Sequence, residues 1–365
     1  MNTRSSKQLS NYFLLIALIS LLIFSCQKQN TLSTTSLNNK TASANSVGLP
    51  PPIIAWLKGP NVPFFDTFNE PVNGVHDAFG FGIGGKGYIG GGYVETVGSA
   101  GFQSNQLWQY DTLTHSWSQG ANFPGNNARF APSFVIGNDA YVCTGGANAT
   151  KENWQYDQTA NAWTRKADFP GYQRFYATAT TINNKGYVGL GVETFHDPYP
   201  DTKDWWQYDP TSDSWSRKAD FAGGKRDGSA SFTINNKGYI SCGHNFNENT
   251  KTHTYYNDLW QYNPTTDSWS QKAFLPSSDR MNAIGLSAFI NKGVVMTGWG
   301  TNGALNDCWQ YNASTNSWSS LPNVGGGPRY FGAGFSLGNT IYVGTGFVNT
   351  QPGETSDFWG LTVNP

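Results

Sequence analysis

The chain is poor in charged residues, and its charges nearly cancel. Only 13% of its 365 residues are charged, and 23 Lys and Arg stand against 24 Asp and Glu. A chain so close to neutral creates no strong field that would attract a polyanion. We therefore expect no nucleic acid partner and no electrostatic attraction to an acidic membrane surface.

Short catalytic and metal-binding motifs are also absent. The sequence contains no His-Glu-x-x-His and no phosphate-binding loop, so no local pattern indicates a zinc enzyme or a phosphate site. Asp197, Asp201 and Asp204 lie close together in the sequence, but their spacing does not match the calcium loop of an EF-hand. We expect no metal and no cofactor.

Cysteine is scarce, with four residues in the whole chain. After Cys26 there remain only Cys143, Cys242 and Cys308. Three is an odd number, and their separations do not match those of metal ligands. The pattern predicts small buried apolar side chains rather than disulfides or metal ligands.

Long apolar runs are rare too, and the clearest one lies at the N-terminus. Arg4 and Lys7 precede an apolar run over residues 12–24, and Ser25 and Cys26 follow it. This run is too short for a membrane-spanning helix, which needs about 20 apolar residues. Charged, apolar and small segments in this order are typical of a secretory signal peptide, and we assign residues 1–25 to one.

The end of this run, Ile23-Phe24-Ser25-Cys26, resembles the lipobox of bacterial lipoproteins. The resemblance implies that Cys26 becomes the lipidated first residue of the mature protein, held on a membrane by its acyl chains. We expect a protein of the cell envelope that faces outside the cytoplasm, on the bacterial outer membrane. Phe24 replaces the small residue usual in a lipobox, so an ordinary secretory signal cleaved nearby remains the alternative.

Residues 26–52 are rich in Ser, Thr and Asn and end in three prolines. Such a composition buries too little apolar surface to fold. It predicts a disordered tether between the lipid anchor and a domain that covers residues 53–365.

This domain contains an aromatic repeat. A Trp-Gln-Tyr motif is followed nine residues later by a second tryptophan in five copies, which begin at Trp108, Trp154, Trp206, Trp260 and Trp309. Trp359 begins a sixth copy but has no tryptophan after it. We expect Trp56 to be its partner, because Pro63 follows Trp56 by seven residues as Pro170 follows Trp163.

Each copy predicts two β-hairpins. Runs in which inward-facing and outward-facing residues alternate, as in a half-buried strand, flank a polar turn between the paired tryptophans. About 30 residues earlier lies a second hairpin, whose turn we place at Asn184-Lys185-Gly186 in the clearest copy, because Asn and Gly tolerate the positive φ of tight turns. Two hairpins make a four-stranded unit.

The spacing of the repeats indicates a fold family. Successive motifs lie 46, 52, 54, 49 and 50 residues apart, a period expected of kelch repeats. With the glycines Gly90–Gly92 and Gly145–Gly146 and the paired aromatics, the chain resembles the kelch-repeat β-propeller family, which includes the central domain of galactose oxidase. The resemblance implies an all-β, six-bladed kelch-type β-propeller whose last blade is closed by an N-terminal strand. We expect a monomer.

A ring of arginines is the first candidate site. One arginine precedes the first predicted strand of five copies, and the first copy has Val75-His76 there instead; the five are Arg129, Arg174, Arg226, Arg280 and Arg329. Related by rotation, they would surround the mouth of the central channel. Guanidinium groups bind carboxylates through two parallel hydrogen bonds, so an acidic ligand is expected. Arginines that instead bond to backbone carbonyls or to an aspartate between blades are the structural alternative.

The loops after the second strand of each blade would share a face with these arginines. They carry Glu193, His244 and Trp299, which we add to the candidate ligand-binding residues. An aromatic residue such as Trp299 can stack on a sugar ring, and filling the base of the loop is the alternative role.

Two classes of function remain open. The first is a non-catalytic binding module for a glycan or protein ligand. The alternative is an envelope carbohydrate-active enzyme resembling the kelch-type sialic acid mutarotases, in which Glu193 would be the acid or base and Arg174 and Arg226 would hold a carboxylate. A copper oxidase is not expected because the sequence has no Tyr-His pair. A purely architectural role is the remaining possibility.

Overall fold

The computed structural model describes residues 54–362, except 97–98, 127, 147–148, 195–198, 289–290 and 349–352. The chain divides into two compact units, Met1–Pro52 and Ile53–Pro365, and all described residues belong to the second. The predicted signal peptide, tether and lipidated Cys26 therefore lie outside the described residues. Among the described residues no helix is long and apolar enough to cross a membrane.

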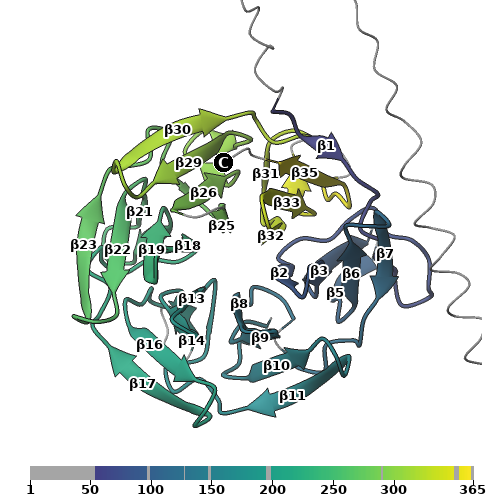
Figure 1. Ribbon diagram of the computed structural model, residues 1–365, viewed down its shortest axis with the longest axis horizontal. Coiled ribbons are helices and arrows are strands. Elements are labelled where there is room, and N and C mark those ends of the chain that lie inside the picture. Colours follow the sequence, from purple (N-terminus) through teal and green to yellow (C-terminus); the bar gives the residue numbers. More distant parts are fainter. Residues whose placement is uncertain are drawn as a thin grey trace, which may run out of the picture. The chain divides into compact units, whose positions relative to one another are not determined.

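The regular structure of the described residues is entirely β-strand, and most of it forms six four-stranded antiparallel sheets (Figure 1). Figure 1 shows the first strand of each sheet near the centre of a ring and the last strand outside. From the inner to the outer strand, the first sheet contains β2 (Phe79–Ile83), β3 (Lys86–Gly90), β6 (Leu107–Asp111) and β7 (Ser116–Gln119), and the second contains β8 (Ser133–Ile136), β9 (Asp139–Cys143), β10 (Asn153–Asp157) and β11 (Ala162–Lys166). The third sheet contains β13 (Thr178–Ile182), β14 (Lys185–Gly189), β16 (Trp205–Asp209) and β17 (Ser214–Lys218), and the fourth contains β18 (Ala230–Ile234), β19 (Lys237–Ser241), β22 (Leu259–Asn263) and β23 (Ser268–Lys272). The fifth sheet contains β25 (Ile284–Ala288), β26 (Lys292–Met296), β29 (Cys308–Asn312) and β30 (Ser317–Leu321), and the sixth contains β32 (Ala333–Leu337), β33 (Thr340–Gly344), β35 (Phe358–Thr362) and β1 (Leu57–Lys58).

The N-terminal strand is the outermost strand of the sixth sheet. In β1, Leu57 lies opposite Gly360 of β35. The neighbouring Trp56 donates its indole N–H to the carbonyl of Pro322, 2.9 Å away. Trp56 thus takes the place that the sequence predicts for it.

The outer tryptophans join neighbouring sheets. Trp163 of the second sheet donates to the carbonyl of Ala121, which follows the outer strand of the first sheet, at 2.9 Å. Trp117, Trp215, Trp269 and Trp318 make the same contact with a backbone carbonyl. The second tryptophan of each motif therefore has two functions, packing and a hydrogen bond between sheets.

The apolar core lies between the sheets, in six clusters that each join two neighbours. Phe134 and Tyr141 of the second sheet pack with Val188 and Tyr208 of the third. Aromatic residues of the sixth and first sheets form an equivalent cluster that contains Phe335. Because the sixth sheet packs on the first as the others pack on their neighbours, the sheets form a ring. Cys143, Cys242 and Cys308 are buried and free, as predicted.

The turn of the first hairpin lies one residue earlier than predicted. Asn183 and Asn184 have φ of 51° and 56°, and β14 already begins at Lys185. Gly186 is needed for a different reason: a Cβ atom there would lie 2.2 Å from the ring of Phe134 on the neighbouring sheet. This glycine allows close packing between sheets.

Five small ribbons lie beside the sheets. They pair the segment before an inner strand with the loop after the second strand, or pair two parts of that loop. They are β4 (Tyr93–Thr96) with β5 (Ser99–Gln103); β12 (Arg174–Phe175) with β15 (Val192–Glu193); β20 (His244–Asn247) with β21 (Thr252–Tyr255); β24 (Arg280–Met281) with β27 (Trp299–Gly300) and β28 (Gly303–Ala304); and β31 (Arg329–Tyr330) with β34 (Phe347–Val348). The two kinds of segment therefore share one face of the ring, as predicted.

Candidate functional site

Four of the five predicted arginines are fully buried within their sheets. Arg280 places Nη1 2.5 Å and Nη2 2.9 Å from the two carboxylate oxygens of Asp307, and Nη1 also donates to the carbonyl of Thr297. The same carboxylate accepts the indole N–H of Trp309 at 2.8 Å. Burial alone would raise the pKa of Asp307, but the hydrogen bonds and charge of Arg280 outweigh it and hold that pKa below its ordinary value.

The arrangement repeats in the third, fourth and sixth sheets, with the pairs Arg174–Asp204, Arg226–Asp258 and Arg329–Asp357. The arginines of all four pairs have no exposed surface. These guanidinium groups bind backbone carbonyls, as the structural alternative expects, and an aspartate that belongs to the same sheet rather than lying between two sheets. That these four arginines contact a ligand stays a prediction, and their complete burial does not favour it.

Arg129 differs from the other four because it is shifted by one residue. Ala128 takes the equivalent position, since its carbonyl accepts from Gly92 N as that of Arg280 accepts from Gly243 N. The Arg129 side chain is 21% exposed and places Nε 3.2 Å from Oδ2 of Asp77. Its guanidinium carbon lies 4.1 Å from the ring centroid of Tyr93. Of the five arginines, Arg129 alone has a partly exposed side chain.

Three aromatic residues lie at the mouth of the central cavity. The inner strands enclose a cavity of about 420 Å³ whose lining includes Phe130, Tyr176 and Phe331. Tyr176 lies 4.5 Å from Phe130 and 5.6 Å from Phe331, centroid to centroid. Burial, and then the charges of Asp77 and Asp227, raise the pKa of Tyr176. The mouth therefore offers aromatic surface between two acidic groups.

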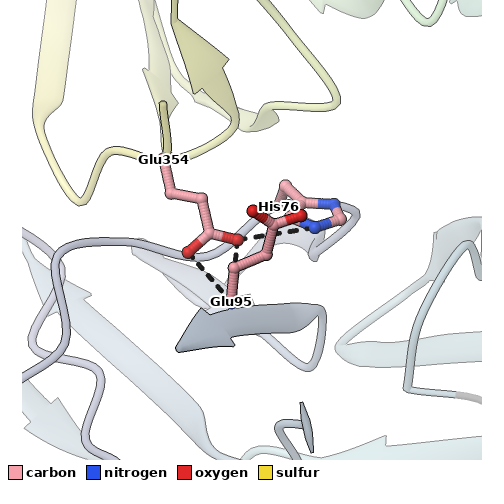
Figure 2. Close-up of side chains that lie close together, drawn as sticks. All are labelled: His76, Glu95 and Glu354. Atoms are coloured by element: carbon pink, nitrogen blue, oxygen red, sulfur yellow. Dashed lines mark hydrogen bonds and ion pairs between the residues drawn. The ribbon is translucent and has the colours of Figure 1, made fainter. Parts of the chain in front are cut away.

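The first acidic group is shown in Figure 2, where the side chains of His76, Glu95 and Glu354 lie together. His76 precedes β2, Glu95 is on β4 and Glu354 follows β34. The His76 Nδ1 lies 2.5 Å from Oδ2 of Asp77, and its Nε2 lies 3.4 Å from Oε1 of Glu354. The backbone N–H of Glu95 donates to both oxygens of Glu354. His76 and Glu354 are buried, while Glu95 is exposed.

The second acidic group contains Asp201, Asp227 and His244, all buried. His244 Nδ1 lies 3.2 Å from Oδ2 of Asp227, and His244 Nε2 lies 2.8 Å from Nδ1 of His253, which is exposed. Asp201 accepts hydrogen bonds from the side-chain amide of Asn245 and from a backbone N–H. A chain of hydrogen-bonding groups thus runs from Asp227 through two imidazoles to the surface.

Burial strongly perturbs this second group. It raises the pKa of Asp201 and of Asp227 to about 7, and for Asp201 the neighbouring Asp227 charge adds to the effect. Burial also lowers the pKa of His244. The group can therefore hold and release a proton near neutral pH, which ordinary aspartates cannot.

Two further predicted residues lie on this face. Glu193 is buried on β15, opposite Arg174 in the β12–β15 pairing. Trp299 is half-buried and packs against Tyr330, with centroids 4.8 Å apart. Of the three aspartates considered for calcium, Asp197 lies outside the described residues, Asp201 is in the second acidic group, and Asp204 binds Arg174.

The comparisons with known proteins concern the fold. No family model matches the chain, and no curated protein matches it. Among solved structures, that of YjhT matches with a TM-score of 0.63 and 17% identity, over 84% of this chain and 95% of that chain. At this identity the likeness shows a shared fold alone, that of a kelch-like β-propeller.

Proposed function

We propose that this protein is a lipid-anchored envelope enzyme that transfers protons at the anomeric centre of a sugar. We propose further that its six sheets are the blades of a kelch-type propeller that the N-terminal strand closes. The observation that supports the enzymatic part most strongly is the hydrogen-bonded series Asp227, His244 and His253. A carbohydrate-active enzyme is therefore the preferred function, and the proton-transferring residues are Asp227, His244 and His253 rather than Glu193.

The chemistry of ring opening fits this arrangement. To open a cyclic sugar, a base removes the proton of the anomeric hydroxyl and an acid protonates the ring oxygen, and closure on the other face reverses both steps. His253 is exposed and can exchange a proton with a bound sugar, while His244 connects it to Asp227. Since the pKa values of Asp201 and Asp227 are about 7, the pair can supply or accept a proton near neutral pH.

The site also has the surface that a sugar needs. Aromatic rings at the mouth, among them Tyr176 and Phe331, offer flat faces for stacking. Arg129 has a partly exposed side chain near them and can attract a carboxylate. An acidic sugar is therefore the preferred substrate class.

The structural neighbour favours the same function. The likeness to the structure of YjhT supports a kelch-like β-propeller fold, which is the fold of the sialic acid mutarotases that the sequence analysis named as the enzymatic alternative. The identity of 17% carries no residue across, so the roles proposed for His253, His244 and Asp227 rest on this chain's own contacts. The envelope location and the lipid anchor rest on residues 1–26 of the sequence.

The test is the rate of anomer exchange in the presence of the full chain. Exchange of N-acetylneuraminic acid, glucuronic acid and glucose is measured by NMR near pH 7 with and without protein. We expect faster exchange for at least one acidic sugar. Exchange at the rate of buffer alone for every sugar would contradict the proposal.

A second candidate is the non-catalytic binding module for a glycan or protein. The partly exposed Arg129 beside the aromatic mouth favours it, because such a surface can hold an acidic ligand without any chemistry. Saturable binding of an acidic sugar that leaves its exchange rate unchanged would establish this function instead.

A further inference from the structure

The group of His76, Glu95 and Glu354 has no part in the proton transfer proposed above, and its three side chains meet from separate segments. One imidazole nitrogen and two carboxylate oxygens lie within 4.8 Å of one another. Figure 2 shows the two carboxylates beside the imidazole. Imidazole and carboxylate are the ligand types that Zn²⁺ and Mn²⁺ accept.

The nitrogen of His76 that faces the carboxylates lacks a hydrogen bond. His76 is 3% exposed, and its Nε2 has no hydrogen-bond partner among the described residues. A buried polar atom without a partner is costly. This buried nitrogen makes no hydrogen bond and faces the carboxylates, with Oε1 of Glu354 3.4 Å away.

Asp77 orients the ring as a carboxylate behind a metal-bound histidine does. The Nδ1–H of His76 can donate to Oδ2 of Asp77, 2.5 Å away, which leaves the lone pair of Nε2 directed toward Glu354. In metal sites a carboxylate in this position fixes the tautomer and makes the imidazole a better ligand. The charge of Asp77 is in turn balanced by Arg129 at 3.2 Å.

The spacing and the charge also fit a divalent ion. Two donor atoms that each lie about 2.1 Å from a tetrahedral ion are about 3.4 Å apart, and His76 Nε2 and Glu354 Oε1 are separated by 3.4 Å. Among the described residues, no Lys or Arg forms an ion pair with Glu95 or Glu354. Two carboxylates and a neutral imidazole would balance a charge of two.

We propose that His76, Glu95 and Glu354 bind a divalent first-row cation of the Zn²⁺ or Mn²⁺ type. Glu95 is exposed, so the ion enters from solvent on its side of the group. Three protein ligands leave at least one coordination position for water or for an oxygen atom of a bound molecule. The sequence gives no local signature of this site, because 259 residues separate Glu95 from Glu354.

The test is metal binding by the full chain after dialysis against a chelator. Titration calorimetry with ZnCl₂ and with MnCl₂ is expected to show one ion per chain for at least one of the two. Glu354→Gln and Glu95→Gln should remove this binding, and Asp77→Asn should weaken it by roughly 10–100-fold. Because Glu95 is exposed, Glu95→Gln separates loss of binding from loss of folding.

Two controls make the result specific. His244→Gln changes a histidine of the other acidic group and should bind the ion as the wild type does. The bound ion should also raise the Tm of the wild type but not that of Glu354→Gln. The proposal would be overturned if neither ion binds at one per chain. It would also be overturned if the His244→Gln protein no longer binds the ion while the Glu354→Gln protein still does.

Discussion

At the scale of single residues, the arginines at the entry to the inner strands have two different roles. Arg174, Arg226, Arg280 and Arg329 stabilise their sheets, whereas Arg129 lies one residue out of register and reaches Asp77. The sequence contains a sign of this difference. Arg129 stands eight residues before Gly137, the first positive-φ residue of its turn, but Arg226 stands nine before Asn235.

The partners of the buried arginines were also visible in the sequence. In each sheet with a buried arginine, an aspartate precedes the first tryptophan by two residues, as Asp258 precedes Trp260. The first and second sheets have Gln106 and Glu152 there instead, and they lack the arginine at the equivalent position. Arginine and aspartate are thus present together or absent together, as expected of a buried ion pair that cannot keep only one partner.

The aspartates of the second acidic group should make stability depend on pH. Their pKa is raised from 3.8 to about 7 in the folded protein, so the folded state holds protons that the unfolded state has lost. The free energy of unfolding should therefore fall as the pH rises from about 4 to about 7. Replacing Asp201 by Asn mimics the protonated acid and should flatten this part of the curve, as measured by urea unfolding at several pH values.

Other titratable groups also contribute to the pH dependence of stability. His244, with its lowered pKa, adds stability as the pH rises toward 6.5, and this effect should be larger in Asp201→Asn because the Asp201 charge raises the pKa of His244. The lowered pKa of Asp204, Asp307 and Asp357 matters only in more acidic solution. Glu70→Gln, at an exposed carboxylate, is the control. An Asp201→Asn protein with the pH dependence of the wild type would show that the pair does not titrate as described.

At the scale of strands and turns, the repeat pattern predicts the hairpins well. The alternation of residues, the polar turns and the position of Trp56 all follow from the sequence. The ribbons beside the sheets do not, because strands of two residues such as β12 and β15 are too short for any periodicity. Such ribbons position Glu193 and His244, so sequence reasoning placed these residues on the right face but did not find their partners.

The packing of neighbouring sheets should be sensitive to the glycine at the start of the second strand in the four sheets that have one, at β3, β14, β19 and β26. Gly186→Ala places a Cβ atom where Phe134 lies, and overpacking of this kind costs about 1–3 kcal/mol. Chemical unfolding should show this loss. The loss should shrink when Phe134 is changed to Leu in the same protein, in a double-mutant cycle. Strictly additive effects would mean that the two positions are not in contact.

At the scale of the whole molecule, the face that carries the candidate site is assembled from distant parts of the chain. The first acidic group joins His76 to Glu354, which follows the inner strands of the sixth sheet, because the ring brings the first and last sheets together. The repeat period predicts the ring, but not which loop residues meet across it. The sequence does show one deviation from the repeat in this part of the face, since the first copy has Val75-His76 where the other copies have an arginine.

Proton transfer to a sugar by His253 and the groups behind it is the central claim. The measurement that tests it most directly is the anomer exchange rate of N-acetylneuraminic acid with wild-type protein, with His253→Gln and with His115→Gln. His115 is an exposed histidine in the turn after β6 and is the matched control. We predict that His253→Gln slows exchange by roughly 10²-fold while His115→Gln leaves it unchanged. Equal rates in all three proteins would contradict the claim.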